Sequence, residues 1–326
     1  MPSQIDWLSH LLEMITITGR LEIRCAYGAP WRVAYGQSAA REIPYHVVVK
    51  GRAILEDPED ETIRELVAGD IVLLPHGSAH VLHDGSGVGP ASVYNREGFH
   101  LTVSENAGTG EYLDMLCGRF FIAPPHDRLM RYYLPTKLVV NSTDGAGVAN
   151  DASTSNNLAA LVGLMRVESN KDLLGGSAIL NALSSALFTL AIRAASESEQ
   201  APMGLLALAG HPRLSPAISG MFSDPARPWT LPDLAGLCSM SRATFIRHFQ
   251  EKMGGSALDL LMDIRMSLAA NELKKTAMTT EAISETVGYQ SVTAFRRVFT
   301  QWAGMTPAEW RRLYRSDNSH ASAAAG

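Results

Sequence analysis

The hydrophobic and polar positions of this 326-residue chain change their period along its length, and the changes mark out separate regions. Up to about residue 140, short apolar or alternating runs such as Tyr45–Lys50 and Ile71–Leu74 are separated by turns rich in Gly, Pro and Asp. Such runs are typical of β-strands. Met115–Ala123 (MLCGRFFIA) is predicted to be a buried strand interrupted by glycine, and residues 85–110 to be an extended surface loop.

The region after residue 140 begins with NSTDGAGVANDASTSNN, which has the composition of a linker. From Asn157 to Glu199 the apolar residues recur at helical spacing, and Asp172–Gly176 (DLLGG) interrupts them. We therefore predict two helices packed as a hairpin. The second helix is apolar on most sides, so we expect it to bury one face on the strands and the other in a partner subunit or in its own chain.

From Leu205 to Tyr314 the pattern is helical throughout and contains a duplication. One copy reads LAGLCSMSRATFIRHFQEKMG and the other ISETVGYQSVTAFRRVFTQWAG, with one extra turn residue in the second copy. The phenylalanines and glycine of the first copy recur 50 residues later, as Phe295, Phe299 and Gly304 after Phe245, Phe249 and Gly254. A repeated helix-turn-helix unit predicts a two-pronged reader of double-stranded DNA.

The second helix of each copy supplies the candidate DNA contacts. A serine is predicted to cap each of these helices, and the phenylalanines to face the core. Arg242 is the best candidate for a base contact, because it lies near the helix start and Arg pairs bidentately with guanine. In the second copy, Val292 and Thr293 are placed for thymine methyl groups. The whole predicted set is Ser241, Arg242, Thr244, Arg247, His248, Ser291, Val292, Thr293, Arg296 and Arg297.

The formal net charge of -5 is unevenly distributed. Residues 1–204 hold 15 Lys and Arg against 23 Asp and Glu, whereas residues 205–315 hold 13 against 9. A basic half joined to an acidic half indicates polyanion binding confined to one domain. The three cysteines are too few for a secreted disulfide framework, and the N-terminus lacks the features of a signal peptide. We expect no membrane span, because no stretch reaches about 18 uncharged apolar residues. We therefore expect a cytoplasmic protein.

A second motif lies in the strand-rich region, where Gly69 to His80 follows the spacing G-x5-P-x-G-x2-H. This spacing resembles the second motif of the cupin β-barrel. The first cupin motif needs an H-x-H pair and a Glu, but only one His, His46, is present at its expected place. The departure argues against a three-His metal site and against a cupin enzyme. His46 and His80 could still meet inside the barrel, or be hydrogen-bonded core residues.

The helical half resembles the DNA-binding domain of the AraC/XylS family of transcription regulators, through ISETVGYQSVTAFRRVFTQWAGMTPAEWRR and DIRMSLAANELKK. The resemblance implies a regulator rather than an enzyme, with recognition helices in successive major grooves and RNA polymerase as a partner. The predicted fold is α+β, with two domains. Its parts are a cupin-like barrel at 1–140, a linker and helical hairpin at 141–204 with possible dimerisation, a double helix-turn-helix domain at 205–315, and a disordered tail at 316–326.

Two cysteines extend the resemblance to the strand-rich region. Cys25 in RCAYGAPW and Cys117 in MLCGRFFIA, together with HPRL and VLLPHGSAH, are similar to reactive-chlorine-sensing regulators of this family. The resemblance implies that hypochlorous acid oxidises the thiols to a disulfide, which activates transcription. A thiolate is favoured by a nearby cation. Arg24 and Arg119 are close in sequence, although strand alternation turns adjacent side chains to opposite faces.

Other interpretations of the barrel stay open. It could bind a small organic ligand, as the barrels of many relatives in this family do. It could also hold zinc or copper, since thiolate and imidazole suit these metals, with His46, His80, Cys25 and Cys117 as ligands. Cys238, in the turn of the first helix-turn-helix copy, is predicted to serve core packing.

Overall fold

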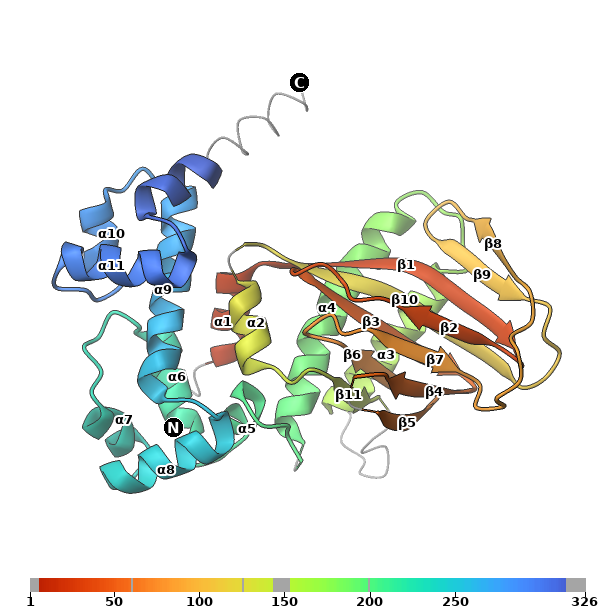
Figure 1. Ribbon diagram of the computed structural model, residues 1–326, viewed down its shortest axis with the longest axis horizontal. Helices are drawn as coiled ribbons and strands as arrows, with labels where there is room; N and C mark the ends of the chain where they lie inside the picture. Colours follow the sequence, from red (N-terminus) through yellow and green to blue (C-terminus); the bar gives the residue numbers. More distant parts are fainter. Residues whose placement is uncertain (1–5, 60, 125, 143–152, 199, 315–326) are drawn as a thin grey trace. The chain divides into compact units, whose positions relative to one another are not determined.

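A computed structural model describes residues 6–314 except 60, 125, 143–152 and 199, and the chain divides into two compact units (Figure 1). One unit is Ile17–Pro202, and the other joins the first sixteen residues to the chain from Met203 onward. The sequence-based boundaries need two corrections, because the first helix belongs with the C-terminal half and the hairpin of 141–204 belongs with the barrel. The predicted tail at 316–326 and most of the linker lie outside the described residues.

Two β-sheets form the barrel unit (Figure 1). The larger has the order β11-β6-β3-β10-β1-β9-β8, and the smaller has the order β2-β7-β4-β5. The strands of the larger sheet are β1 Ile17–Gly28, β3 Glu42–Lys50, β6 Asp70–Leu73, β8 Val93–Glu97, β9 Thr102–Asn106, β10 Tyr112–Ile122 and β11 Leu138–Asn141. Those of the smaller sheet are β2 Arg32–Tyr35, β4 Arg52–Asp57, β5 Thr62–Val67 and β7 His80–His83.

One apolar core joins the inner faces of these sheets. Trp31, Leu55 and Leu82 on the side of the small sheet pack in one cluster with Val48 and Met115 of the large sheet. Both Cys25 and Cys117 belong to this cluster. The cysteines therefore project into the barrel, since residues two apart on a strand share a face.

The outer face of the large sheet is covered by two helices, α3 (Thr154–Glu168) and α4 (Gly176–Glu197). The Tyr45 hydroxyl hydrogen-bonds the Ser184 hydroxyl at 2.8 Å, and the Phe120 and Phe188 rings lie 5.1 Å apart. With a mean hydropathy of 1.5, α4 is long and apolar enough to cross a membrane, which the sequence interpretation did not anticipate. Its apolar side packs on β1 and β10 instead, so its composition is that of a core helix.

The segment 85–110 is not only the loop that was expected. It contains β8 and β9, and β9 pairs in parallel with β1, where Cys25 lies opposite Ser104. Ser104 and Asn106 of β9 are buried, whereas every residue of β8 is exposed, so two strands join the sheet without an apolar run. A seven-residue helix, α2 (Asp127–Tyr133), connects β10 to β11.

The second unit is helical. Its N-terminal helix α1 (Trp7–Ile15) packs on α6 and α9, where Asn271 donates a hydrogen bond to the Met14 carbonyl at 2.6 Å. The chain then passes through Thr16, whose φ of 31° is rare for a β-branched residue, into β1. The helices that follow are α5 Leu205–Ala209, α6 Ser215–Ser223, α7 Leu231–Leu237, α8 Arg242–Met253, α9 Ala257–Lys275, α10 Thr280–Thr286 and α11 Val292–Ala303, and residues 307–314 are also helical.

Candidate functional site

Cys25 and Cys117 lie on neighbouring strands of the large sheet and face the barrel interior. Cys25 of β1 pairs with Met115 of β10, and Cys117 pairs with Ile23, so the two cysteines are diagonal neighbours on one face. Both are free thiols, 1% and 4% exposed. Each thiol shifts the pKa of the other. The structure thus brings the predicted pair together across one strand interface.

His46 contacts Cys117 of this pair from the neighbouring strand, β3. It lies on β3 opposite Cys117, and its Nδ1 is 3.1 Å from the Cys117 sulfur. Its Nε2 is 2.8 Å from Nε2 of His80, the histidine that ends the cupin-like motif. The His80 Nδ1 lies 2.9 Å from the Ser78 carbonyl oxygen. Both histidines are buried, so they do meet inside the barrel.

Two tyrosines complete the surroundings, and the sequence interpretation missed both. The Tyr35 ring stacks on His80 with centroids 4.7 Å apart, and its hydroxyl donates to the Cys117 sulfur at 3.9 Å. Tyr27 hydrogen-bonds Ser104 at 2.7 Å and also contacts Cys25. No motif marks these tyrosines; the only signal was their strand period, which places Tyr27 on the same face as Cys25.

Hydrogen bonding and burial shift the pKa values of this cluster. Interaction with the Cys117 thiol, assisted by Tyr27 and Tyr35, lowers the pKa of Cys25 below that of an ordinary thiol. Interaction with the Cys25 thiol, together with burial, raises the pKa of Cys117. The two thiols therefore titrate as a coupled pair and not independently.

Burial also acts on the two histidines. It lowers the pKa of His46 well below its ordinary value, and the neighbouring His80 adds to the effect. The pKa of His80 is lowered as well, chiefly by burial. Both imidazoles are therefore neutral at physiological pH.

A cavity of about 350 Å³ reaches this cluster from outside. Tyr35, His46, His80 and Cys117 line it, whereas Cys25 is not among the described residues that do so. An ion cluster also lines this cavity, in which Arg119 contacts Glu22 at 3.0 Å and Glu42 at 3.0 Å. Cys117 is thus the thiol that the cavity reaches.

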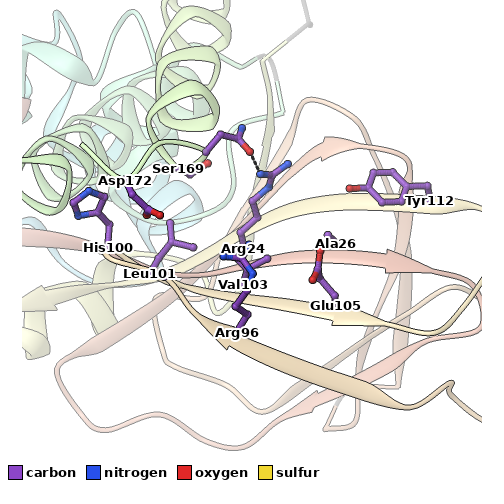
Figure 2. A pocket seen from close by; sticks show the side chains of 12 residues that line it. Arg24, Ala26, Arg96, His100, Leu101, Val103, Glu105, Tyr112, Ser169 and Asp172 are labelled. Atoms are coloured by element: carbon purple, nitrogen blue, oxygen red, sulfur yellow. Dashed lines mark hydrogen bonds between the residues drawn. The ribbon is translucent and has the colours of Figure 1, made fainter. Parts of the chain in front are cut away.

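Neither arginine that flanks the cysteines supplies a cation to them. Arg24 points to the outer face, where it forms a bidentate pair with the buried Asp114, both contacts being 2.8 Å. Figure 2 shows Arg24 with Glu105 and Tyr112 in a separate polar pocket of about 280 Å³. Its guanidinium also hydrogen-bonds Asn170 there. Arg119 is held by two carboxylates, so hydrogen bonds rather than cations tune the thiols.

The predicted metal set does not assemble. His46 uses opposite ring nitrogens toward His80 and toward Cys117, so these groups do not converge on one point. Within the described ranges, no three His, Cys, Asp or Glu side chains are placed to hold one metal ion.

The first helix-turn-helix copy is formed by α7 and α8. The Ser241 hydroxyl caps α8 by accepting from the Thr244 amide at 3.2 Å, and Phe245 and Phe249 are buried. Arg242 and Arg247 are exposed, whereas Thr244 and His248 are half-buried. His248 lies 3.6 Å from Glu251.

The second copy, α10 and α11, repeats this arrangement with one difference. Its support helix begins at Thr280, before the repeated segment that starts at Ile283. Ser291 caps α11, Thr293 and Arg297 are exposed, and Val292 is half-buried. Arg296 is not free, since its guanidinium contacts Glu281 at 2.7 Å.

A loop and the linking helix tie the two copies together. Arg265 of α9, for which the sequence suggested no role, donates to the carbonyls of Pro225 and Arg227 at 2.7 and 2.8 Å. Its guanidinium lies over the Tyr289 ring of the second turn. Gly288 has φ of 82°, and a Cβ there would lie 2.3 Å from the Ala226 carbonyl oxygen. These contacts fix the turn of the second copy against the start of the first.

Comparison with known families gives matches to both halves of the chain. A family model described as Cupin matches residues 6–197, and one described as Helix-turn-helix domain matches residues 234–313. The first match spans more than half of the chain.

Curated relatives align over nearly the full length. The chain is 28% identical over 311 residues to the RCS-specific HTH-type transcriptional activator RclR of Escherichia coli K12, covering 95% of this chain and 99% of RclR. It is also 28% identical over 311 residues to the HTH-type transcriptional regulator MtrA of Neisseria gonorrhoeae, covering 94% and 98%.

Solved structures are similar at lower levels. ToxT of Vibrio cholerae matches 93% of this chain and 98% of its own, with 15% identity and a TM-score of 0.36. The DNA-binding domain of AdpA in complex with a target DNA matches 32% of this chain and 95% of its own, with 25% identity and a TM-score of 0.31.

Proposed function

This chain belongs to the cupin family, carries an AraC-type helix-turn-helix domain and is a transcriptional regulator, and we propose that its barrel senses oxidants through Cys25 and Cys117. The observation that carries the proposal is the pair of buried free thiols that are diagonal neighbours on one face of β1 and β10. An oxidant such as hypochlorous acid converts the pair to a disulfide, and the disulfide form activates transcription.

The register of the pair suggests how a bridge produces a signal. Diagonal neighbours of an antiparallel ladder lie about 7–8 Å apart, whereas disulfide-bonded residues prefer Cα separations of about 5.5–6 Å. Forming the bond therefore draws β1 toward β10 locally. The register of β1 already shifts between Leu21 and Ile23, next to Cys25, and such irregularities are where strands bend.

The output is sequence-specific binding of double-stranded DNA by α8 and α11. Exposed Arg242 at the start of α8 is proposed to contact bases, and Arg247 and His248 to contact phosphates. Val292 and Thr293 are proposed to meet thymine methyl groups. Arg296, Arg297 and the capping serines position α11 and α8 on the backbone. We place the protein in the cytoplasm, with RNA polymerase as its partner at the promoter.

Thiol mapping coupled to DNA binding tests this function. The purified full chain is treated with sub-stoichiometric and equimolar hypochlorous acid, its thiols are alkylated and identified by mass spectrometry, and operator affinity is measured on the same samples. We expect a Cys25–Cys117 disulfide to form in proportion to the change in DNA binding. A change in DNA binding with both thiols still alkylated would overturn oxidant sensing by this pair.

One observation also favours the alternative of a small organic ligand. The cavity of about 350 Å³ lies at the lower end of the sizes that ligand pockets have. A ligand-responsive barrel would shift operator affinity without oxidant, and the double variant Cys25→Ser/Cys117→Ser would keep that response. The zinc or copper alternative finds no such support, because its proposed ligands do not converge.

A homodimer is proposed from the helical hairpin. Apolar side chains of α3, α4 and the turn between them are exposed, namely Leu164, Val167, Leu173, Leu174 and Ile179. Exposed apolar clusters of this kind mark interaction sites. Light scattering of the full chain and of Leu164→Glu checks the proposal: we expect a dimer for the first and a monomer for the second. A monomeric wild-type chain contradicts it.

A further inference from the structure

The hydrogen bonds around His46 have only one consistent direction. A carbonyl oxygen accepts and never donates, so the His80 Nδ1 at 2.9 Å from the Ser78 carbonyl carries the proton. A neutral imidazole has one N–H, so the His80 Nε2 accepts. The His46 Nε2 at 2.8 Å must then donate to it, which leaves the His46 Nδ1 as an acceptor.

This direction identifies the donor at the end of the chain. The atom at 3.1 Å from the His46 Nδ1 is the Cys117 sulfur, so the Cys117 S–H donates to a ring nitrogen. Cys25 has no equivalent contact among its described neighbours, which are Cys117 and the hydroxyls of Tyr27 and Tyr35. Only Cys117 of the pair touches a group that can take up its proton.

Access favours the same residue. Cys117 lines the cavity, and Cys25, 1% exposed, does not. The ion cluster that also lines the cavity holds the carboxylates of Glu22 and Glu42 and the single guanidinium of Arg119, an excess of negative charge. That excess favours a small neutral oxidant over an anion.

We propose that Cys117 is the thiol that attacks the oxidant, that His46 takes up its proton, and that Cys25 then closes the disulfide. The inference rests on the proposed oxidant sensing and adds an order of events and two further residues to it. His46 contacts the reacting sulfur directly. His80 is a positioning residue, because it holds His46 in the tautomer whose Nδ1 accepts.

The chemistry balances with hypochlorous acid as the oxidant. The Cys117 S–H gives its proton to the His46 Nδ1 as the sulfur attacks chlorine. An S–Cl bond forms, the Cl–O bond breaks, and the leaving hydroxide takes the proton from His46 to become water. Cys25 then attacks the Cys117 sulfur, the S–S bond forms, chloride leaves, and the Cys25 proton is released. The two thiols are oxidised by two electrons, and chlorine is reduced to chloride.

The groups that influence this proton come from several strands. Cys25 and Tyr27 of β1, Tyr35 of β2 and His80 of β7 contact the cluster directly. The carboxylates of Glu22, Asp57 and Asp114 act at longer range. The two thiols titrate as a coupled pair, so contact with His46 and with the cavity decides which sulfur reacts.

Single-cysteine variants of the full chain test the order. Cys25→Ser and Cys117→Ser are mixed with equimolar hypochlorous acid, quenched with methionine at set times, and the remaining thiols are alkylated and counted by mass spectrometry. We expect Cys117 in Cys25→Ser to be oxidised as fast as in the wild type, and Cys25 in Cys117→Ser at least about 100-fold more slowly, the usual size of general base assistance. The reverse order overturns the proposal and leaves the thiol switch intact. Two unreactive thiols overturn both.

Variants of the histidines test the relay. His46→Asn keeps an acceptor near the Cys117 sulfur but cannot hold its proton. We expect its Cys117 oxidation to be about 100-fold slower at neutral pH and to rise about tenfold per pH unit, since only free thiolate then reacts. Wild-type oxidation should change little over the same range. An unchanged rate and pH profile overturns the role of His46.

A second pair of variants keeps the test decisive where His46→Asn does not fold. His80→Gln can still accept from the His46 Nε2, whereas His80→Leu cannot. We expect His80→Leu to slow Cys117 oxidation and His80→Gln to restore it to within about threefold. The matched control is His83→Asn, on the same strand as His80 but beside Glu56 and outside the relay, which should leave the rate unchanged. Equal rates for His80→Leu and wild type overturn the relay.

Discussion

The barrel unit and the helical unit place their chemistry in opposite environments. Cys25 and Cys117 are 1% and 4% exposed, and the properties of each depend on side chains from other strands. Arg242 and Arg247 are exposed on one helix, and what they can contact depends on their position in that helix. The proposed thiol sensing therefore depends on the assembled fold, whereas the proposed DNA contacts depend mainly on a capped helix.

The same comparison holds for charged neighbours. Alternation along β1 turns Arg24 away from Cys25 and into a bidentate pair with Asp114, so this arginine supplies no cation to the thiols. In the helical unit, exposure leaves cations available, except where an ion pair such as Arg296–Glu281 holds one. Each of the following predictions changes one unit and uses the other as its reference.

The largest expected effect is the loss of the response to oxidant, with DNA binding retained. Cys25→Ser or Cys117→Ser should abolish oxidant-induced reporter expression, because neither variant can form the disulfide. Cys25→Ala and Cys117→Ala should lose the response as the serine variants do. That result would show that the loss of sulfur, and not the burial of a hydroxyl, is the cause. Operator binding of the reduced variants should equal that of the reduced wild type. Full induction in both single variants would contradict a thiol switch.

The next effect is confined to the output. Arg242→Ala should weaken operator binding by about 1–3 kcal/mol, the value of a bidentate Arg–guanine pair, and should weaken non-specific binding far less. Arg296→Ala is the matched control, since Glu281 already holds its guanidinium, and it should cost less. Thiol oxidation should be unchanged in both. Titrations on operator and scrambled DNA at one salt concentration measure this, and equal losses on both DNAs would make Arg242 a phosphate contact.

A pH effect should appear in the barrel unit and not in the helical one. Burial lowers the pKa of His46 and His80 in the folded state, so below about pH 6.5 the unfolded chain binds protons that the folded chain does not. Their contribution to stability is therefore complete above that pH and is lost as the pH falls. The slope is up to about 1.4 kcal/mol per pH unit per histidine.

Urea unfolding followed by pulsed hydrogen exchange, with labelling at one common pH, resolves the two units. The exchange midpoint of β3 and β10 peptides should fall with pH, and His46→Asn should flatten that dependence. A barrel midpoint that stays constant from pH 7 to about 5 would show that these histidines do not titrate as their burial implies.

The smallest effect is expected for the third thiol. Cys238 is buried in the turn between α7 and α8, its pKa is raised by burial, and its sulfur lies 4.0 Å from the Leu214 carbonyl oxygen. It has no thiol beside it among the described residues, so Cys238→Ser should leave induction by oxidant unchanged. Reporter assays beside the two barrel variants check this. A lost response would move part of the sensing into the helical unit.

The helical unit was largely predictable from sequence because its signals are local. Serine caps, phenylalanines four residues apart and terminal glycines each act within one helix, and the structure places Ser241, Phe245 and Gly254 accordingly. The start of α10 lies outside the repeat, because Thr279 caps it. The pairing of Arg296 with Glu281 was not foreseen, since it joins residues of two helices that lie 15 positions apart in the sequence.

The barrel was predictable in outline only. The G-x5-P-x-G-x2-H spacing indicated the fold and placed His80 inside, but the contacts of His46 with Cys117 and His80 depend on which strands pair. Tyr35 had no motif, and β8 and β9 had no apolar run to reveal them. These features depend on pairing between strands that are far apart in the sequence, which the local pattern of residues does not reveal.

The route of the chain through Thr16 and Met203 has a practical consequence for dissecting this protein. The barrel is inserted in the sequence of the helical unit, since α1 belongs to that unit and the chain returns to it at Met203. A fragment cut at Met203 would lose the Met14 carbonyl that Asn271 binds and the Trp7 ring that lies 6.3 Å from Phe222. A DNA-binding module suitable for transplantation therefore consists of two pieces of chain, with α1 rejoined to the C-terminal half by a short linker.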